Sequence, residues 1–176
     1  MKLERITDME HEWYQKATAL YQISFPVHEQ REKASQEKIL GWNDYHFYLI
    51  LEENTFVGLL LGWETERFLY IEHFCIQPEL RGRRYGQRVL EELREAGRQV
   101  ILEIDPPVGD VSIRRKQFYS RCGFVENPYH HVHPPYHRGN QGHELVVLSS
   151  PAAISGEEYQ RFRDYLERRV MADVYD

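Results

Sequence analysis

The sequence lacks the features that mark secreted, membrane-bound or disulfide-linked proteins. It contains only two cysteines, Cys75 and Cys122, and they follow no ligand or disulfide pattern. No apolar run approaches the ~20 residues of a membrane span, and the first residues carry no signal-peptide pattern. We therefore expect a cytoplasmic protein with reduced core thiols and no membrane partner.

Excess basic charge is absent as well. The formal net charge is −6 and the isoelectric point is about 5.9, which argues against a nucleic-acid partner. No repeat, low-complexity tract or linker divides the 176 residues, so the sequence predicts a single domain over residues 1–176.

Apolar residues recur with the periods of helices and strands. Strands are expected at 3–6, 45–51, 55–63, 68–76, 100–104, 123–125 and 143–149, and helices at 9–23, 29–40, 85–97, 112–121 and 157–171. Because a helix joins segments 68–76 and 100–104, a right-handed crossover makes them parallel neighbours. The pattern predicts an α+β fold with a mixed, mostly antiparallel sheet flanked by helices.

A basic glycine loop, Arg-Gly-Arg-Arg-Tyr-Gly at residues 81–86, lies between the strand at 68–76 and the next helix. Backbone N–H groups at a helix N-terminus are unpaired and carry partial positive charge, so an anion binds well there. Glycines allow the backbone to approach the ligand closely, and arginines add charge-assisted contacts. On an acidic chain, this loop predicts a site for a small phosphate-bearing ligand.

The loop and a second block resemble the GNAT acetyltransferase superfamily. The family's loop, Gln/Arg-x-x-Gly-x-Gly/Ala, is matched within residues 76–86, except that Arg84 stands at the first signature glycine. The family's aromatic-Tyr-x-x-x-Gly-Phe block is matched by Phe-Tyr-Ser-Arg-Cys-Gly-Phe at residues 118–124. Ser112 stands where the family often has asparagine. The resemblance, strongest over residues 47–124, implies a GNAT-like sheet whose central parallel strand pair splays apart.

The same resemblance implies acetyl-CoA as co-substrate. Its pyrophosphate would lie on the glycine loop, and its pantetheine arm would run between the two parallel strands. The cofactor-binding residues that the resemblance implies are Phe74, Ile76, Arg81, Gly82, Arg83, Arg84, Tyr85, Gly86, Gln87 and Ser112.

Acetyl transfer to an amine needs an acceptor for the amine proton and a proton donor for the leaving thiolate. Tyr119 matches the family's usual tyrosine acid. Glu72 and Glu103 lie inside apolar strand segments, where burial would raise their pKa toward the range useful for a base. The Leu-Glu-Ile segment around Glu103 resembles one in ribosomal-protein N-terminal acetyltransferases, so we place Glu103 ahead of Glu72. Either could instead orient the amine or a relay water. Strand alternation places His73 on the face opposite Glu72.

Residues 127–137, Asn-Pro-Tyr-His-His-Val-His-Pro-Pro-Tyr-His, are an unusual stretch. As a proline-bounded loop, they predict an aromatic and imidazole lid over the acceptor, with Tyr136 binding the substrate. The segment at 25–31 would form the opposite wall, where Glu29 could recognise a cationic acceptor. The four histidines at 130, 131, 133 and 137 could also form a metal site. No carboxylate or cysteine stands at a familiar ligand spacing, so we expect no metal to be required.

These features together predict an N-acetyltransferase in which a primary amine of a small molecule or peptide attacks acetyl-CoA directly. The alternative is a CoA-binding regulatory module of the same fold with little catalysis, and a histidine-rich metal-binding domain comes third. The sequence leaves open which amine is the acceptor and whether the protein is a monomer or a homodimer.

Overall fold

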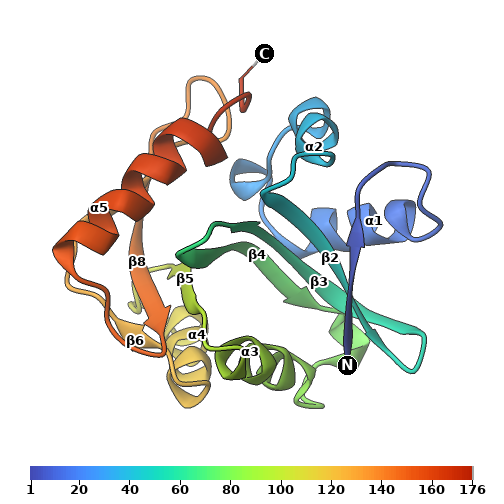
Figure 1. Cartoon of the computed structure of the whole chain (residues 1–176), viewed down its shortest axis with the longest axis horizontal. Helices are drawn as coiled ribbons and strands as arrows, with labels where there is room; N and C mark the ends of the chain where they lie inside the picture. The colour runs from blue at the N-terminus through green and yellow to red at the C-terminus, as the bar shows by residue number, and fades with distance from the viewer. Residues whose placement is uncertain (176) are drawn as a thin grey trace.

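The computed structural model describes residues 1–175, which are built around one mixed β-sheet (Figure 1). The strands are β1 (Lys2–Ile6), β2 (Tyr45–Glu52), β3 (Thr55–Glu64), β4 (Phe68–Ile76), β5 (Gln99–Ile104), β6 (Val125–Glu126), β7 (His131–His133) and β8 (His143–Ser150). Their order across the sheet is β1-β2-β3-β4-β5-β8-β6, and β7 pairs with β8 off this path. Among the described strands, β4 and β5 are the parallel pair and the other pairs are antiparallel. The predicted fold class is confirmed.

Helices cover both faces of the sheet (Figure 1). One face shares a hydrophobic cluster with α1 (Tyr14–Ser24), α2 (Lys33–Ile39), α5 (Gly156–Tyr165) and the π-helical turn η3 (Leu166–Val170). The other face packs against α3 (Tyr85–Glu95) and α4 (Asp110–Arg121). The apolar stripe of α3 causes this arrangement, since Val89 and Leu90 are each 1% exposed. Two 3-10 turns, η1 (Val27–Glu29) and η2 (Pro78–Leu80), complete the chain near the cleft described below.

The environment of the cysteines and the length of the helices bear on what the sequence lacks. Both cysteines, Cys75 and Cys122, are buried and free, as predicted. No helix within residues 1–175 is long and apolar enough to cross a membrane.

The strand predictions agree with the structure to within about two residues, but several helix predictions need correction. The helix expected at 9–23 begins at Tyr14, because side chains pair with the backbone before it. Asp8 accepts the Glu10 N–H at 3.0 Å, and His11 accepts the Trp13 N–H at 3.3 Å. The helix expected at 29–40 is divided into η1 and α2, and the terminal helix changes to π geometry after Tyr165.

A strand at His131–His133, β7, forms where the sequence predicted a loop. It pairs with β8, so that His131 lies opposite Leu145 and His133 opposite His143. The pairing joins segments separated by a turn-rich stretch, and no local periodicity indicates it. This strand fixes both histidine rings on one side of the chain.

A β-bulge in β4 corrects the predicted orientation of His73. Opposite β4, Leu61 pairs with His73 whereas the next residue, Gly62, pairs with Ile71, so Glu72 is the extra residue. A bulge interrupts the alternation of side chains. Glu72 and His73 therefore line the same cleft instead of opposite faces of the sheet. The bulge also needs glycine across from it, since a Cβ at Gly62 would lie 2.7 Å from a β4 carbonyl oxygen.

The parallel pair separates partway along its length, as predicted. β4 pairs with β5 only from Phe68 to Ile71, although β4 continues to Ile76. Beyond this point β5 keeps its antiparallel partner β8. One edge of β4 after Ile71 therefore has no strand beside it, and backbone polar groups there need another partner.

Candidate active site

A cleft of ≈ 1250 Å³ opens where β4 and β5 separate. Its lining includes most of the residues predicted from the sequence: Glu29, Glu72, Phe74, Ile76, Arg81, Gly82, Arg84, Tyr85, Gly86, Gln87, Glu103, Tyr119 and Tyr136. Arg83 and Ser112 are outside the set of lining residues. The Ser112 hydroxyl is bonded to Gly109, donating to its carbonyl at 2.9 Å and accepting its N–H at 3.1 Å. Cofactor contacts of Arg83 and Ser112 stay predictions.

The glycine loop leads into the N-terminus of α3 and leaves its first amides free. The helix's first backbone bond joins the Arg88 N–H to the Arg84 carbonyl at 3.0 Å. The amides of Tyr85, Gly86 and Gln87 therefore have no partner within the helix. All three residues line the cleft, so partial positive charge gathers at that end of it.

Arg84 has a backbone conformation that favours glycine. Its φ is 63°, in the left-handed region, and Gly82 two residues earlier has a φ of 76°. A side chain in this region costs roughly 1–2 kcal/mol in an L-residue. Arg84 therefore places a strained side chain at a position whose backbone conformation favours glycine.

Replacing Arg84 with glycine is expected to raise the free energy of unfolding by about 0.5 kcal/mol. Relief of the left-handed strain, roughly 1–2 kcal/mol, exceeds glycine's extra chain entropy of roughly 0.5–1 kcal/mol. Gly82→Ala is the control, because its new Cβ would meet no atom within 4 Å and only the φ would oppose it. Urea unfolding should show a loss of about 0.5 kcal/mol for Gly82→Ala, since alanine's smaller chain entropy offsets part of the same strain. An equal loss for Arg84→Gly would contradict the strain.

Tyr119 lines the cleft from α4. Its ring is held by the rings of Phe118 and Phe124, with centroids 5.2 and 5.7 Å away. Burial raises the pKa of Tyr119 to about 12, so the hydroxyl keeps its proton at neutral pH. No hydrogen bond to another residue is found for this hydroxyl within the described chain, which leaves it free for a ligand.

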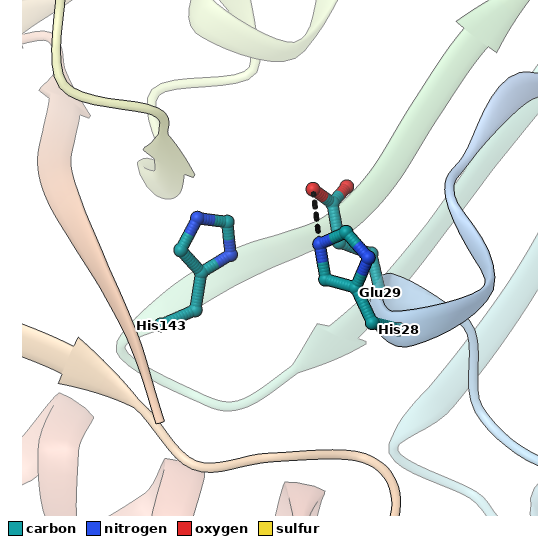
Figure 2. Close-up of side chains that lie close together, drawn as sticks. All are labelled: His28, Glu29 and His143. Carbon is teal, nitrogen blue, oxygen red and sulfur yellow. Dashed lines mark ion pairs between the residues drawn. The ribbon is translucent and has the colours of Figure 1, made fainter. Parts of the chain in front are cut away.

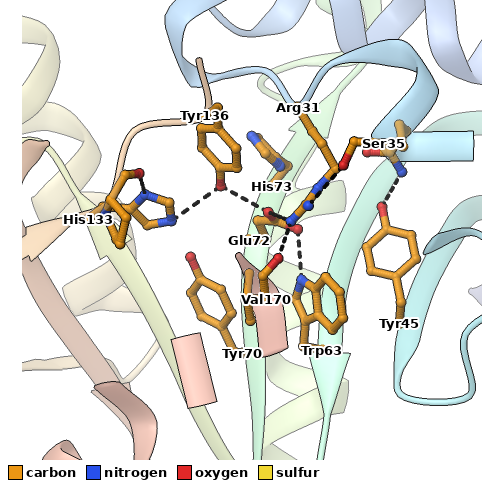
Figure 3. Close-up of polar contacts among 12 residues, drawn as sticks. Arg31, Ser35, Tyr45, Trp63, Tyr70, Glu72, His73, His133, Tyr136 and Val170 are labelled. Atoms are coloured by element: carbon orange, nitrogen blue, oxygen red, sulfur yellow. Dashed lines mark hydrogen bonds and ion pairs between the residues drawn. The ribbon is translucent and has the colours of Figure 1, made fainter. Parts of the chain in front are cut away.

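Glu72 lies in the cleft wall within a closed set of hydrogen bonds (Figure 3). It accepts from Arg31 Nη2 at 3.1 Å, from Trp63 Nε1 at 2.8 Å and from the Tyr136 hydroxyl at 2.9 Å. The Arg31 and Glu72 side chains are only 0% and 1% exposed. Arg31 also donates to the Val170 carbonyl at 2.7 Å, which ties the ion pair to the C-terminal π turn.

Glu103 has a similar set of partners on β5. It accepts from the Tyr70 hydroxyl at 2.5 Å and pairs with His131 Nε2. The other ring nitrogen of His131 lies 2.9 Å from the Tyr159 hydroxyl, so the ring is held at both ends. The side chains of Glu103 and His131 are 6% and 1% exposed.

These partners correct the prediction that burial raises the pKa of the two carboxylates. Burial does act in that direction on Glu72, but the charge of Arg31 outweighs it together with the hydrogen bonds, and its pKa is lowered. For Glu103, burial is likewise outweighed, first by His133 and then by His131, so its pKa is lowered too. Both groups are ionised at neutral pH, and a carboxylate with a lowered pKa is a weak proton acceptor.

The histidines of residues 130–137 do not gather into one site. His131 and His133 are 1% and 4% exposed and lie on β7, whereas His130 is exposed. His137 Nε2 bonds the Val27 carbonyl at 2.8 Å, which fastens the segment after β7 to η1. Within residues 1–175, no three metal-ligand side chains from this segment come close enough to hold one ion. Within the described residues, the four histidines are therefore not brought together around one point.

A second group of polar side chains, one exposed and two half-buried, also lines the cleft; Figure 2 shows its three members. This mouth cluster consists of His28 and Glu29 from η1 and His143 from β8, with side-chain nitrogen and oxygen atoms within 4.8 Å of one another. His143 Nε2 also lies 3.3 Å from Asp105 Oδ1. Burial and then the negative charge of Asp105 raise the pKa of Glu29. Two carboxylates near each other favour a cationic group between them.

Sequence reasoning did not assign a role to Arg31, the partner of Glu72. A carboxylate inside an apolar strand is a signal that a buried cation faces it, because an unpaired buried charge is very costly. The two residues lie 41 positions apart, so nothing local shows which cation pairs with Glu72.

Comparisons with known proteins agree with this fold. Residues 10–124 match the family described as the Acetyltransferase (GNAT) family. YjbC of Bacillus subtilis (strain 168), whose name assigns it to the acetyltransferases, is 24% identical over 181 residues, covering 93% of this chain and 88% of that protein. A Bacteroides thetaiotaomicron structure named as a GNAT-family acetyltransferase superposes with a TM-score of 0.90 at 28% identity, covering 97% of this chain and 98% of that one.

A Bacillus subtilis acetyltransferase solved in complex with CoA shares the fold, with a TM-score of 0.55 at 15% identity over 84% of this chain and 95% of that one. The family match extends over more than half of the present sequence and includes both motif blocks. The chain therefore belongs to the GNAT family of acetyltransferases.

Proposed function

We propose that the protein transfers the acetyl group of acetyl-CoA to a primary amine by direct attack, without an acyl-enzyme. The observation that carries this proposal is the continuity of one cleft. It joins the free amides at the start of α3 to Tyr119 and to the wall that holds Glu72 and Glu103. An anion-binding end, a proton donor and an ionised wall are the parts that this reaction needs.

The cofactor end of the cleft fits CoA on several grounds. The amides of Tyr85, Gly86 and Gln87 offer hydrogen bonds to a pyrophosphate, and Arg81 and Arg84 add charge beside them. The unpaired edge of β4 could hold the pantetheine arm by strand-like pairing, as strand edges hold extended ligands. Phe74 and Ile76 line this part of the cleft. CoA would supply the activated acetyl group as a thioester.

Tyr119 is the proposed proton donor to the CoA thiolate. Its raised pKa of about 12 keeps it protonated, and its hydroxyl has no competing protein partner within the described residues. Glu72 and Glu103 were predicted as alternative bases. The amine proton should move toward these two ionised carboxylates in the cleft wall. It would reach them either directly or through another group.

The acceptor would enter past the mouth cluster. Glu29 and Asp105 give this end negative character, which favours an ammonium group. The Tyr136 hydroxyl donates to Glu72, so we propose that its ring, tilted against the His133 ring at a centroid distance of 4.9 Å, forms the acceptor surface. These features favour a cationic amine as the class of acceptor, without favouring one particular amine.

Thiol release from acetyl-CoA over a panel of amines tests the proposal. The panel should contain peptides with free N-termini, polyamines, aminoglycosides and amino-acid amines. We expect turnover with at least one amine, and CoA at 100 times its Kd should stabilise the fold by about 2.7 kcal/mol in unfolding experiments. Stabilisation by CoA without turnover on any amine would instead favour the regulatory module. Absence of both effects would contradict either reading.

A further inference from the structure

His133 lies near the buried carboxylate of Glu103, contacts Glu72 through the Tyr136 hydroxyl, and is fixed by β7. Its ring is 4% exposed and lines the cleft. The strand pairing with β8 sets its position, and the Tyr136 ring lies 4.9 Å away at an interplanar angle of 31°. Figure 3 shows its ring directed toward the Tyr136 hydroxyl and Glu72.

The hydrogen bonds of His133 determine which nitrogen carries the proton. Nδ1 lies 2.6 Å from the Pro134 carbonyl oxygen, which can only accept, so Nδ1 must be the donor. In the neutral ring Nε2 then has a lone pair. The Tyr136 hydroxyl lies 3.3 Å from Nε2 but 2.9 Å from Glu72 Oε1, and its single proton goes to the closer, charged acceptor. The Nε2 lone pair is therefore left without a donor.

The neighbouring carboxylates are less suited to receive a proton than His133. Glu72 already accepts three hydrogen bonds and Glu103 accepts two. His73 also lines the cleft, but its ring is packed edge-on against Tyr21 and Phe25 at 5.0 and 4.6 Å, and burial lowers its pKa.

We propose that His133 Nε2 is the group that takes the proton from the acceptor ammonium, with Glu72 and Glu103 stabilising the imidazolium that forms. The inference rests on the proposed acetyl transfer and replaces the carboxylates as its base. Orientation of the ring by the Pro134 carbonyl and charge stabilisation by two fixed carboxylates make this a preorganised base.

The step balances as follows in protons and bonds. The ammonium gives one proton to His133 Nε2, and the neutral amine nitrogen attacks the thioester carbonyl carbon. The carbon–sulfur bond breaks, and Tyr119 gives its proton to the CoA sulfur. A second proton leaves the new amide nitrogen and restores Tyr119, after which His133 releases its proton to solvent.

The first test reads the protonation of His133 without any acceptor. Long-range ¹H–¹⁵N spectra of the labelled protein, assigned with a His133→Asn variant, should show a protonated Nδ1 and an unprotonated Nε2 at pH 8. A ring with its proton on Nε2, or a charged ring at this pH, would overturn the proposal. This outcome is independent of whether acetyl transfer is found, so the two proposals can fail separately.

The second test uses turnover of His133→Asn with butylamine and 2,2,2-trifluoroethylamine as probes. The asparagine amide can keep the bond to the Pro134 carbonyl but has no Nε2. At pH 7 we expect butylamine turnover to fall roughly 10- to 100-fold, at the lower end of general-base effects. The loss should shrink as pH rises toward the ordinary amine pKa of about 10.4, where solvent removes the proton. The ammonium form of trifluoroethylamine is far more acidic, so turnover of this amine should fall much less in His133→Asn.

A uniform loss at every pH and with both amines would mean a merely structural role and would overturn the proposal. His46→Gln is the matched control, since His46 stacks on Tyr48 in β2 and is outside the cleft lining. Titratable groups from several elements surround His133 and contribute to its pH profile. They are the carboxylates Glu72 and Glu103, the histidines His73, His131 and His143, and the tyrosines Tyr70 and Tyr136. Arg31 acts through its ion pair with Glu72.

Discussion

Replacing Tyr119 with phenylalanine is expected to lower kcat by about 10²- to 10⁴-fold while leaving CoA binding unchanged. The substitution removes only the hydroxyl, and the ring contacts with Phe118 and Phe124 remain. The size of the effect is that of losing a positioned general acid. Steady-state thiol release at saturating substrates measures kcat, and stabilisation by CoA in thermal unfolding measures binding.

Tyr165→Phe is a suitable control for this variant. Its hydroxyl donates to Asp44 at 2.7 Å and is outside the cleft lining, so turnover should not change. Because burial raises the pKa of Tyr119 to about 12, its hydroxyl keeps its proton between pH 6 and 10. A kcat for Tyr119→Phe within threefold of the unchanged protein would contradict its role as the acid.

Replacing Arg31 with methionine is expected to lower the free energy of unfolding by about 3–5 kcal/mol. The change leaves the buried carboxylate of Glu72 without its cation, and an uncompensated buried charge has a cost of this size. Urea unfolding at pH 7 measures the loss. Arg163→Met is the control, since its pair with Glu167 is exposed and should contribute less than about 1 kcal/mol.

The pH dependence gives this prediction a second readout. The pKa of Glu72 is lowered in the folded protein, so its stabilising contribution is present above its usual value of 4.5 and is lost as pH falls through the lower folded pKa. Without Arg31, burial should raise the pKa of Glu72. Protonation of Glu72 in acid should then remove the unpaired buried charge and reduce the destabilisation of Arg31→Met. The difference in free energy of unfolding between the unchanged protein and Arg31→Met should therefore shrink as pH falls from about 7 to about 4. Adding Glu72→Gln to Arg31→Met should recover part of the loss, and strict additivity would contradict the pairing.

The fold was predictable because its determinants are local. Apolar periodicity predicted β2, β3 and β4 nearly to the residue, and the crossover rule predicted the parallel neighbour β5. The glycine loop predicted the anion-binding end, since a strand, a turn and a helix start are consecutive in sequence. The prediction failed where side chains compete with the backbone, as at Asp8 and His11, and where pairing is long-range, as in β7.

The sequence by itself indicated the family and predicted the proposed cofactor loop and candidate acid, because each depends on a short motif. Only the tertiary structure decided the state of the carboxylates. Arg31 reaches Glu72 from 41 positions away, and His133 and His131 reach Glu103 from β7. Their charges and hydrogen bonds reverse the effect of burial on the pKa. The bulge at Glu72 and the strand at His133 are likewise products of sheet pairing. The pKa of each carboxylate depends on its distance in space from charged and hydrogen-bonding partners. Those distances cannot be predicted from neighbouring residues in the sequence.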